Sequence, residues 1–274
     1  MYDGVSLFDG LQRVTGELRV SVKRRGGESV LDGLRQAGCL KARFPRAVAP
    51  GWFDTTTVNT SGGVVGGDRL ETRVSIGEGA RATIAAQAAE RFYRALPGGA
   101  PSRVRTSVHV GANAAAEWLP QETILFDRCG LDRRLMVDVA PGSWFLGVEM
   151  LVFGRAAMGE RVVTAHLRDL IQVRRGDELL LHDTIRFDGE VDRLLERTAI
   201  AGGARAVATL VYVAPDAEAR LDAVRAAADC GASAWNGMLI ARMLASDGAS
   251  SRRSVMAALA VLRDGRPLPR AWLC

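Results

Sequence analysis

Acidic side chains stand in or beside two of the most apolar segments of the chain, where carboxylates could do chemistry. Glu117, Glu122 and Asp127 bracket the first segment, which contains Trp118 and Phe126. Two carboxylates can serve as general acid and base, and hydrolases of this kind hold the pair a few ångströms apart. Hard carboxylate oxygens also suit a metal ion that must be released again, and Glu122 with Asp127 could line its path. The residues leave both interpretations open: a carboxylate-dependent hydrolase on a β-rich fold, or a metal path.

Glu149 interrupts the second apolar segment, Trp144 to Phe153. Burying a lone carboxylate costs several kcal/mol unless it is paired or hydrated. Glu149 therefore either forms an ion pair with a core arginine such as Arg155 or faces a wet cavity with a functional role.

Two glycine pairs, Gly62-Gly63 and Gly66-Gly67, flank two valines just before Asp68. Glycine pairs permit close backbone packing or positive φ at neighbouring corners. The segment lacks the lysine and the GK[ST] order of a phosphate-binding loop, and the alternation that follows indicates a strand rather than a helix. We expect a structural corner that holds Asp68, with nucleotide binding as the weaker alternative.

Histidines and cysteines form no ligand pattern. His109, His166 and His182 fall on alternating segments without HxH or HxxxH spacing. The four cysteines lie far apart without a CxxC pair, which argues against a zinc site and a disulfide framework. We expect free thiols, no tight metal site and an incidental terminal thiol at Cys274.

The elements that position these groups are mainly strands. Apolar residues alternate in several segments, which is typical of half-buried strands, and Gly- or Pro-containing turns separate them at the spacing of successive antiparallel strands. The fold class expected is mainly β, with antiparallel or β-helical-like stacked strands. The alternating sets are Leu18, Val20 and Val22; Val74 and Ile76; Val104, Thr106, Val108 and Val110; and Leu135, Val137 and Val139.

The final third combines strands with helices. Residues 167–173 and 179–187 flank a short Gly-containing connection and predict a hairpin, with Leu179 and Phe187 on one face and His182 on the other. Two α-helices are expected, from Pro215 through Cys230 and from a Ser250 or Ser251 cap to just before Gly265. One domain over 1–274, with its helices in 214–274, is the simplest organisation.

Composition restricts the partners. The net charge is +5, but only two lysines occur and the arginines are spread along the chain among acids. No basic stripe interleaved with aromatics points to a nucleic acid. No apolar run reaches the length of about 18 residues that indicates a membrane span. The N-terminal stretch from Met1 to Gly10 lacks the basic start and apolar core of a secretory signal, so we expect a cytoplasmic protein.

Four segments, taken in order, resemble the UreD family, also called UreH. They are NTSGGVVGGDRL from Asn59, AAQAAERFYRA from Ala85, EWLPQETILFD from Glu117 and FLGVEMLVFGRAAMGE from Phe145. The resemblance extends from about Lys41 to the C-terminal region, whereas residues 1–40 and Cys274 match the family pattern poorly.

The resemblance implies a urease accessory scaffold without catalytic residues of its own. It implies complexes with UreF, UreG and the urease apoprotein, a possible dimer within that assembly, and passage of nickel toward the urease active site without a permanently bound cofactor. Transient nickel contacts would fall on Asp68, Glu122 and Glu149. The tunnel or interface candidates on this chain are Asp68, Gln87, Glu122, Asp127, Glu149 and Arg155.

Overall fold

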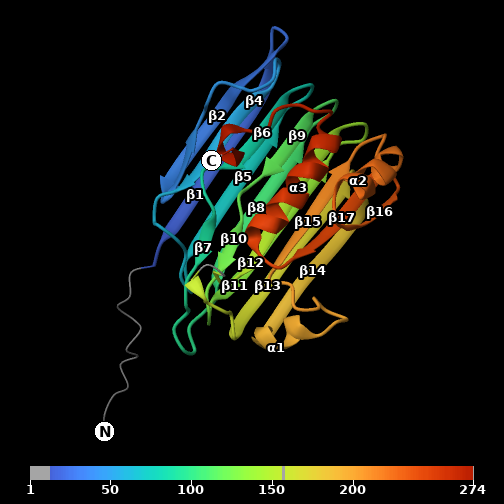
Figure 1. Cartoon of the computed structure of the whole chain (residues 1–274). Helices are drawn as coiled ribbons and strands as arrows, with labels where there is room; N and C mark the ends of the chain where they lie inside the picture. Colours follow the sequence, from blue (N-terminus) through green and yellow to red (C-terminus); the bar gives the residue numbers. More distant parts are fainter. Residues whose placement is uncertain (1–12, 156–157, 274) are drawn as a thin grey trace.

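The computed structural model describes residues 13–155 and 158–273 of the chain. Two β-sheets stack face to face, and a helical layer covers the outer face of the second sheet (Figure 1). The predictions for the stretch from Met1 to Gly10 and for Cys274 concern residues outside this description.

Within the described residues, the first sheet has seven strands and the second has ten. Among the described residues, the first sheet consists, in spatial order, of β14 (Glu178–Glu190), β13 (Thr164–Arg175), β11 (Gly130–Val139), β8 (Ser102–Val110), β5 (Arg69–Ile76), β1 (Thr15–Arg25) and β2 (Glu28–Gly38). The second consists of β16 (Gly231–Trp235), β17 (Met238–Ala245), β15 (Ala206–Val213), β12 (Trp144–Phe153), β9 (Ala115–Leu119), β6 (Arg81–Ala86), β4 (Phe53–Asn59) and β3 (Leu40–Arg43), with β7 (Glu90–Phe92) and β10 (Thr123–Leu125) attached beside β12.

The chain crosses from one sheet to the other at most of its turns. Strands β4, β6, β9 and β12 lie in the second sheet, and β5, β8, β11 and β13 alternate with them in the first. Neighbours within a sheet are therefore parallel through the centre, as in β1 with β5, β5 with β8, and β11 with β13. The expectation of stacked, β-helical-like strands is confirmed. The expectation that successive strands pair antiparallel is wrong here, because a turn signal marks a reversal of the chain but not the layer to which it returns.

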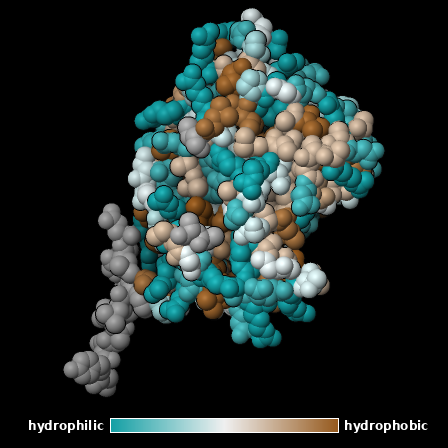
Figure 2. Space-filling model, viewed as in Figure 1, coloured by the Kyte–Doolittle hydropathy of each residue, from teal (hydrophilic) through white to brown (hydrophobic). Residues whose placement is uncertain are grey.

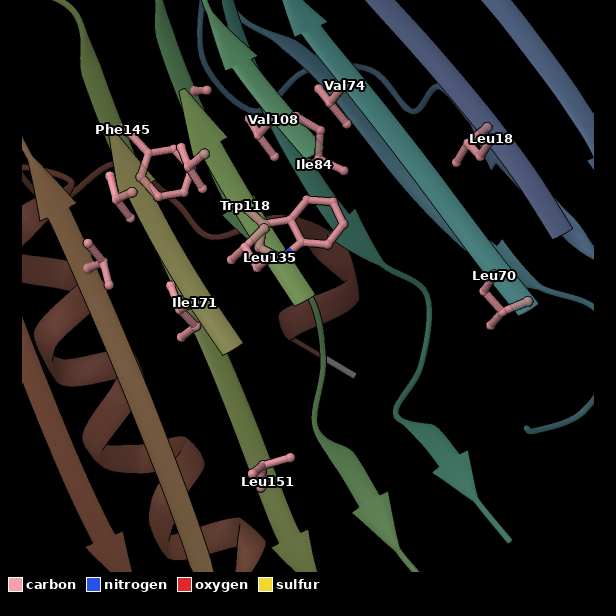
Figure 3. Packing of buried hydrophobic residues seen from close by; sticks show 14 of the residues in the cluster. Leu18, Leu70, Val74, Ile84, Val108, Trp118, Leu135, Phe145, Leu151 and Ile171 are labelled. Carbon is pink, nitrogen blue, oxygen red and sulfur yellow. The ribbon is translucent and has the colours of Figure 1, made fainter. Parts of the chain in front are cut away.

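Period-two alternation positions the core between the sheets. The inward residues of the first sheet, such as Leu18, Leu70 and Leu135, pack against those of the second, and Trp118 projects between the two layers (Figure 3). Every alternating set expected from the sequence faces this core, with Val104 partly buried at its edge. Burial of apolar area of this kind is the main stabilising contribution.

A second core lies between the second sheet and the helices α2 (Leu221–Ala227) and α3 (Gly248–Leu262). Val255, Leu259 and Leu262 of α3 are buried against it, as their helical spacing predicts. Trp272 of the short 3₁₀-helix η3 (Arg270–Trp272) closes one end. Figure 2 shows this side of the molecule, where brown and tan residues gather toward the upper part and teal residues surround them. None of the helices among residues 13–155 and 158–273 is long and apolar enough to cross a membrane.

The helices differ from the expectation in three details. A third helix, α1 (Val191–Glu196), follows β14. Helix α2 is shorter than expected, because a 3₁₀ turn, η2 (Glu218–Arg220), precedes it and Ala228 is already extended. The cap of α3 is Asp247, whose carboxylate accepts the Ser250 N–H at 2.8 Å, so the helix begins a turn before the predicted serine cap.

The predicted hairpin is present as β13 and β14, which pair antiparallel. His182 is exposed on its outer side, and Phe187 packs against the core. Leu179 is exposed instead of sharing the inner face with Phe187. The reason is a register shift after Val173, which places Leu180 in a bulge and turns Leu179 outward.

Candidate functional site

A cavity of about 280 Å³ lies between the two sheets. It is located where β4, β6 and β9 end and where β5, β8 and β11 begin. Gln87 and Arg91 are exposed at its outer end, whereas Arg133 and Glu149 are buried at its inner end. The lining thus leads from solvent into the space between the sheets.

Arg133 organises the inner end of the cavity. Its Nε and Nη2 donate to the two carboxylate oxygens of Asp169 at 2.7 and 2.6 Å, and its Nη1 lies 2.7 Å from Glu149 Oε2. Nη1 also donates to Thr123 Oγ1 at 2.7 Å. The indole Nε1 of Trp118 donates to the other oxygen of Glu149 at 2.8 Å. The guanidinium therefore holds two carboxylates from different sheets, and five strands, β9 to β13, contribute to one hydrogen-bonded group.

Burial governs the electrostatics of this group. It raises the pKa of Glu149 above its usual range, Arg133 partly offsets that rise, and the neighbouring Asp169 adds to it. Burial alone would lower the pKa of Arg133, but Asp169 and then Glu149 outweigh it, so the pKa of Arg133 is raised. Arg133 stays cationic, whereas burial works against the charged form of Glu149.

The outer end of the cavity holds a second acid. Asn59 Nδ2 donates to Glu90 Oε2 at 3.0 Å, and burial raises the pKa of Glu90. The glycine corner forms the adjacent wall, where Val64 N–H donates to Arg91 O at 2.8 Å. Gly63 has φ +141, and a Cβ at this position would collide with the Tyr93 ring. Only glycine permits this close approach.

Two of the six predicted site residues, Gln87 and Glu149, line this cavity. Asp68 lies in the glycine corner, is 2% exposed, and accepts the Val14 and Val65 N–H groups at 2.8 and 2.9 Å. Its carboxylate thus holds the corner together, as the structural interpretation of this segment expected.

Glu122, Asp127 and Arg155 lie in three other environments. Glu122 pairs with Arg252 of α3 at 3.0 Å. Asp127 Oδ1 accepts the backbone N–H groups that open β13, at 2.9 and 3.0 Å. Arg155 pairs with Glu160 at 2.6 Å and stacks on the Phe126 ring. The suggested partner for Glu149 is therefore wrong, because the arginine beside it is Arg133.

The arrangement gives little support to carboxylate-based hydrolysis. Glu117 is fully buried and accepts two bonds from Arg263 at 2.8 and 3.1 Å, which ties the end of α3 to β9. Glu149 has a second carboxylate near it, Asp169, but Arg133 bridges both. Two carboxylates committed to one guanidinium are poorly placed to act as general acid and base on a substrate.

Nor does the cavity contain a cage of strong metal ligands. Among the described residues, no three His, Cys, Asp or Glu side chains are grouped so that they could hold a metal ion. Cys39 and Cys129 are buried free thiols, and Cys230 is a partly buried one.

The family model of the UreD urease accessory protein matches residues 14–273. The chain belongs to the UreD family. The match begins inside the stretch of residues 1–40 that the sequence motifs left uncertain. Membership of this family gives the chain a general role in urease maturation.

Relatives named as urease accessory protein UreD support the same assignment. The chain is 46% identical over 266 residues to that of Azorhizobium caulinodans, covering 95% of this chain and 97% of the relative. It is 45% identical over 266 residues to that of Xanthobacter autotrophicus, covering 95% and 90%. A protein of Methylorubrum populi, named urease accessory protein UreD 2, is 44% identical over 272 residues, covering 95% and 91%. These names describe accessory proteins rather than enzymes.

Two residues that line the cavity of this UreD-family chain, Glu90 and Arg133, and the Arg133 partner Asp169 are not among the residues expected from the sequence. Arg133 precedes Leu135 by two positions, and Asp169 lies between Leu167 and Ile171, so both occupy inward positions of alternating strands. A charged residue at an inward position is the signal that could have found them. Glu90 lies in the segment that begins at Ala85, where the neighbouring residues do not indicate burial.

Proposed function

We propose that this chain is a non-enzymatic scaffold and metallochaperone that inserts nickel into the urease apoprotein. It acts in the cytoplasm in complex with UreF and UreG, and nickel passes through the cavity between the two sheets. Membership of the UreD family supports the general role. The cavity, with Glu90 near its outer end and Glu149 at its inner end, is the observation that favours the passage of a cation.

The donor set suits transit better than storage. Gln87, Glu90 and Glu149 offer oxygen atoms, which bind nickel(II) less tightly than imidazole or thiolate would. Glu149 is also held by Arg133, so a passing cation has to compete with a guanidinium for its oxygens. A contact of this kind is weak and brief, which is what a conduit requires.

The structure reduces the set of residues that we propose to contact nickel in transit. Both oxygens of Asp68 accept backbone hydrogen bonds, and Glu122 is paired with Arg252. Glu149 remains from the original set, and Glu90 joins it because both acids line the cavity and both have a raised pKa through burial.

Urease activation in cells tests the proposal. Urease activity and nickel bound per urease active site are measured in four strains. One lacks the gene for this chain, and the others carry the wild type, Glu149→Gln or Glu160→Gln. Glutamine keeps the shape of Glu149 and an acceptor for Trp118, but it removes the charge. Glu160 lies outside the cavity in a half-exposed pair with Arg155, so its variant is the matched control.

We expect the deletion to abolish nickel loading and Glu149→Gln to reduce it, while Glu160→Gln matches the wild type. Unimpaired loading in the deletion strain would refute the proposed function. Unimpaired loading with Glu149→Gln, in a strain where the deletion abolishes it, would refute the role of the cavity acid and leave the scaffold role standing.

A further inference from the structure

The outer face of the seven-stranded sheet carries three rows of charged side chains that run across its strands. The rows arise from the register of the strands, which places outward residues side by side. One row contains Arg69, Arg103, Asp132, Arg168 and Arg186; the next contains Glu17, Glu71, Arg105 and Arg134; the third contains Arg35, Arg19 and Arg73. We call these twelve residues the arginine face.

The arginine face concentrates the positive charge of the protein. It holds nine arginines and three acids, a formal charge of +6. The whole chain has a formal charge of +5, so the rest of the molecule is close to neutral. In the sequence these arginines are dispersed among acids between positions 19 and 186. Because the chain crosses repeatedly between the sheets, each strand of the first sheet brings one or two arginines to a single surface. The order of residues along the sequence does not show this surface.

The acids of the arginine face cannot neutralise it. Glu17 is shared by Arg19 and Arg35, at 2.6 and 3.0 Å. Asp132 is likewise shared by two arginines of the second row. Arg69, Arg103 and Arg168 are exposed and form no ion pair with any residue in the described ranges. Their guanidinium groups remain available to a partner.

We infer that the arginine face is a docking surface for an acidic surface of another protein. Exposed guanidinium groups bind carboxylates in bidentate geometry, which gives orientation as well as attraction. A second copy of this chain does not fit, because two such faces would repel each other. The face lies on the side of the molecule opposite the helical layer of Figures 1 and 2, so no helix of the described ranges covers it.

A nucleic acid fits this surface less well than a protein does. Single strands bind to aromatic platforms, and no residue of the three rows is aromatic. Reading a duplex requires an element that enters a groove, whereas this surface is the broad face of a sheet. Asp132 and the two glutamates, placed between the arginines, repel phosphates but can orient a protein partner that carries charges of both signs.

The size of the face predicts a transient contact. It spans about 29 Å across the seven strands and about 14 Å along them, or on the order of 400 Å². Stable complexes bury about 800 Å² on each partner. An exposed contact of this size depends on salt and accelerates association more than it prolongs it.

The test of this inference rests on the proposed function, which supplies the three candidate partners. Purified urease apoprotein, UreF and UreG are titrated separately with the full-length wild type, with Arg103→Gln/Arg168→Gln and with Arg46→Gln/Arg197→Gln, at low and at physiological salt. All four arginines are exposed, and none has an ion pair within the described part of the chain. Both double variants lose the same charge, but only the first changes the arginine face. Poly-L-glutamate and a short DNA duplex serve as reference polyanions.

We expect at least one of the three proteins to bind the wild type and the Arg46/Arg197 control equally. The Arg103/Arg168 variant should bind it about tenfold more weakly and with a smaller dependence on salt, a difference of ~1.4 kcal/mol. Equal binding of both variants would overturn the inference and leave the proposed function intact.

The reference polyanions separate the remaining outcomes. If the wild type binds none of the three proteins, the proposed complex is overturned. If, in that case, the wild type still binds poly-L-glutamate and the Arg103/Arg168 variant does not, the result supports the arginine face as an acid-binding surface. If the wild type binds the DNA duplex more tightly than any of the three proteins, and the Arg103/Arg168 variant does not bind it, the arginine face is a nucleic-acid surface and the inference is refuted.

Discussion

Replacing Arg133 by methionine should destabilise the protein strongly, in a way that depends on pH. Methionine has a similar length but no charge, so the substitution leaves Glu149 and Asp169 without the guanidinium that bridges them. The two carboxylates are only 6% and 5% exposed, so water replaces the lost partner only in part. Removing one member of a buried ionic group costs about 3 to 5 kcal/mol. For a chain of this size the melting temperature would fall by about 6 to 20 °C.

The direction of the pH dependence follows from linkage. Without Arg133 to offset them, burial and the neighbouring Asp169 raise the pKa of Glu149 in the folded state further above its value in the unfolded state. The folded protein then binds more protons than the unfolded chain between those values, so stability falls as pH rises through the folded pKa. The deficit relative to the wild type should therefore shrink when pH is lowered from about 7.5 to about 5.

The assay is urea unfolding across this pH range. It compares the wild type, the single variant Arg133→Met and the triple variant Arg133→Met/Glu149→Gln/Asp169→Asn. The triple variant carries no buried charge at this position, so it should be more stable than Arg133→Met near neutral pH, and the difference from the wild type should depend little on pH. A single variant as stable as the wild type, or a deficit that stays constant with pH, would refute the assignment of Arg133 as the bridge between two buried acids.

Three further predictions concern other parts of the fold. Asp247→Ala removes the cap of α3 and should cost about 1 kcal/mol in urea unfolding, whereas Ser251→Ala, at the predicted cap, should not remove a cap bond. Asp68→Ala removes two hydrogen bonds to a buried carboxylate and should cost about 3 kcal/mol, at about 1.5 for each bond; an unchanged melting temperature would contradict its structural role. Burial raises the pKa of Cys129 to about 12, so iodoacetamide near pH 8 should leave this thiol unmodified in the folded protein and label it after denaturation, as mass spectrometry can show.

The sequence predicted the inward positions of the strands because alternation is a local property. Leu18 and Val74, for example, face the core as their spacing requires. It did not predict which strands become neighbours. A turn such as Gly77-Glu78-Gly79 can return the chain beside the strand just completed or carry it to the opposite layer, and the residues of the turn are similar in both cases. Parallel pairing of β5 with β8 depends on contacts between distant segments.

The candidate site is also only partly predictable from the sequence, because a local pattern shows which charged residues are buried but not which of them meet. Glu149 was identified because an acid in an apolar strand needs a partner or a cavity, and the structure provides both. The sequence suggests Arg155, the nearest arginine along the chain, as one possible partner, whereas the sheets bring Arg133 from another strand. Charged residues at inward positions identify the members of a buried network, but only the packing of the two layers decides which of them meet.

The proposed passage of nickel through the cavity between the two sheets can be tested by blocking that cavity. Ala86 lines this cavity, so Ala86→Phe would fill part of it, while Ala260→Phe adds the same bulk to the exposed side of α3. The decisive measurement is the nickel content of urease purified from cells that carry each variant, after confirming equal amounts of folded accessory protein. We expect nickel-poor urease with Ala86→Phe and fully loaded urease with Ala260→Phe. Full loading with Ala86→Phe would contradict the proposed passage.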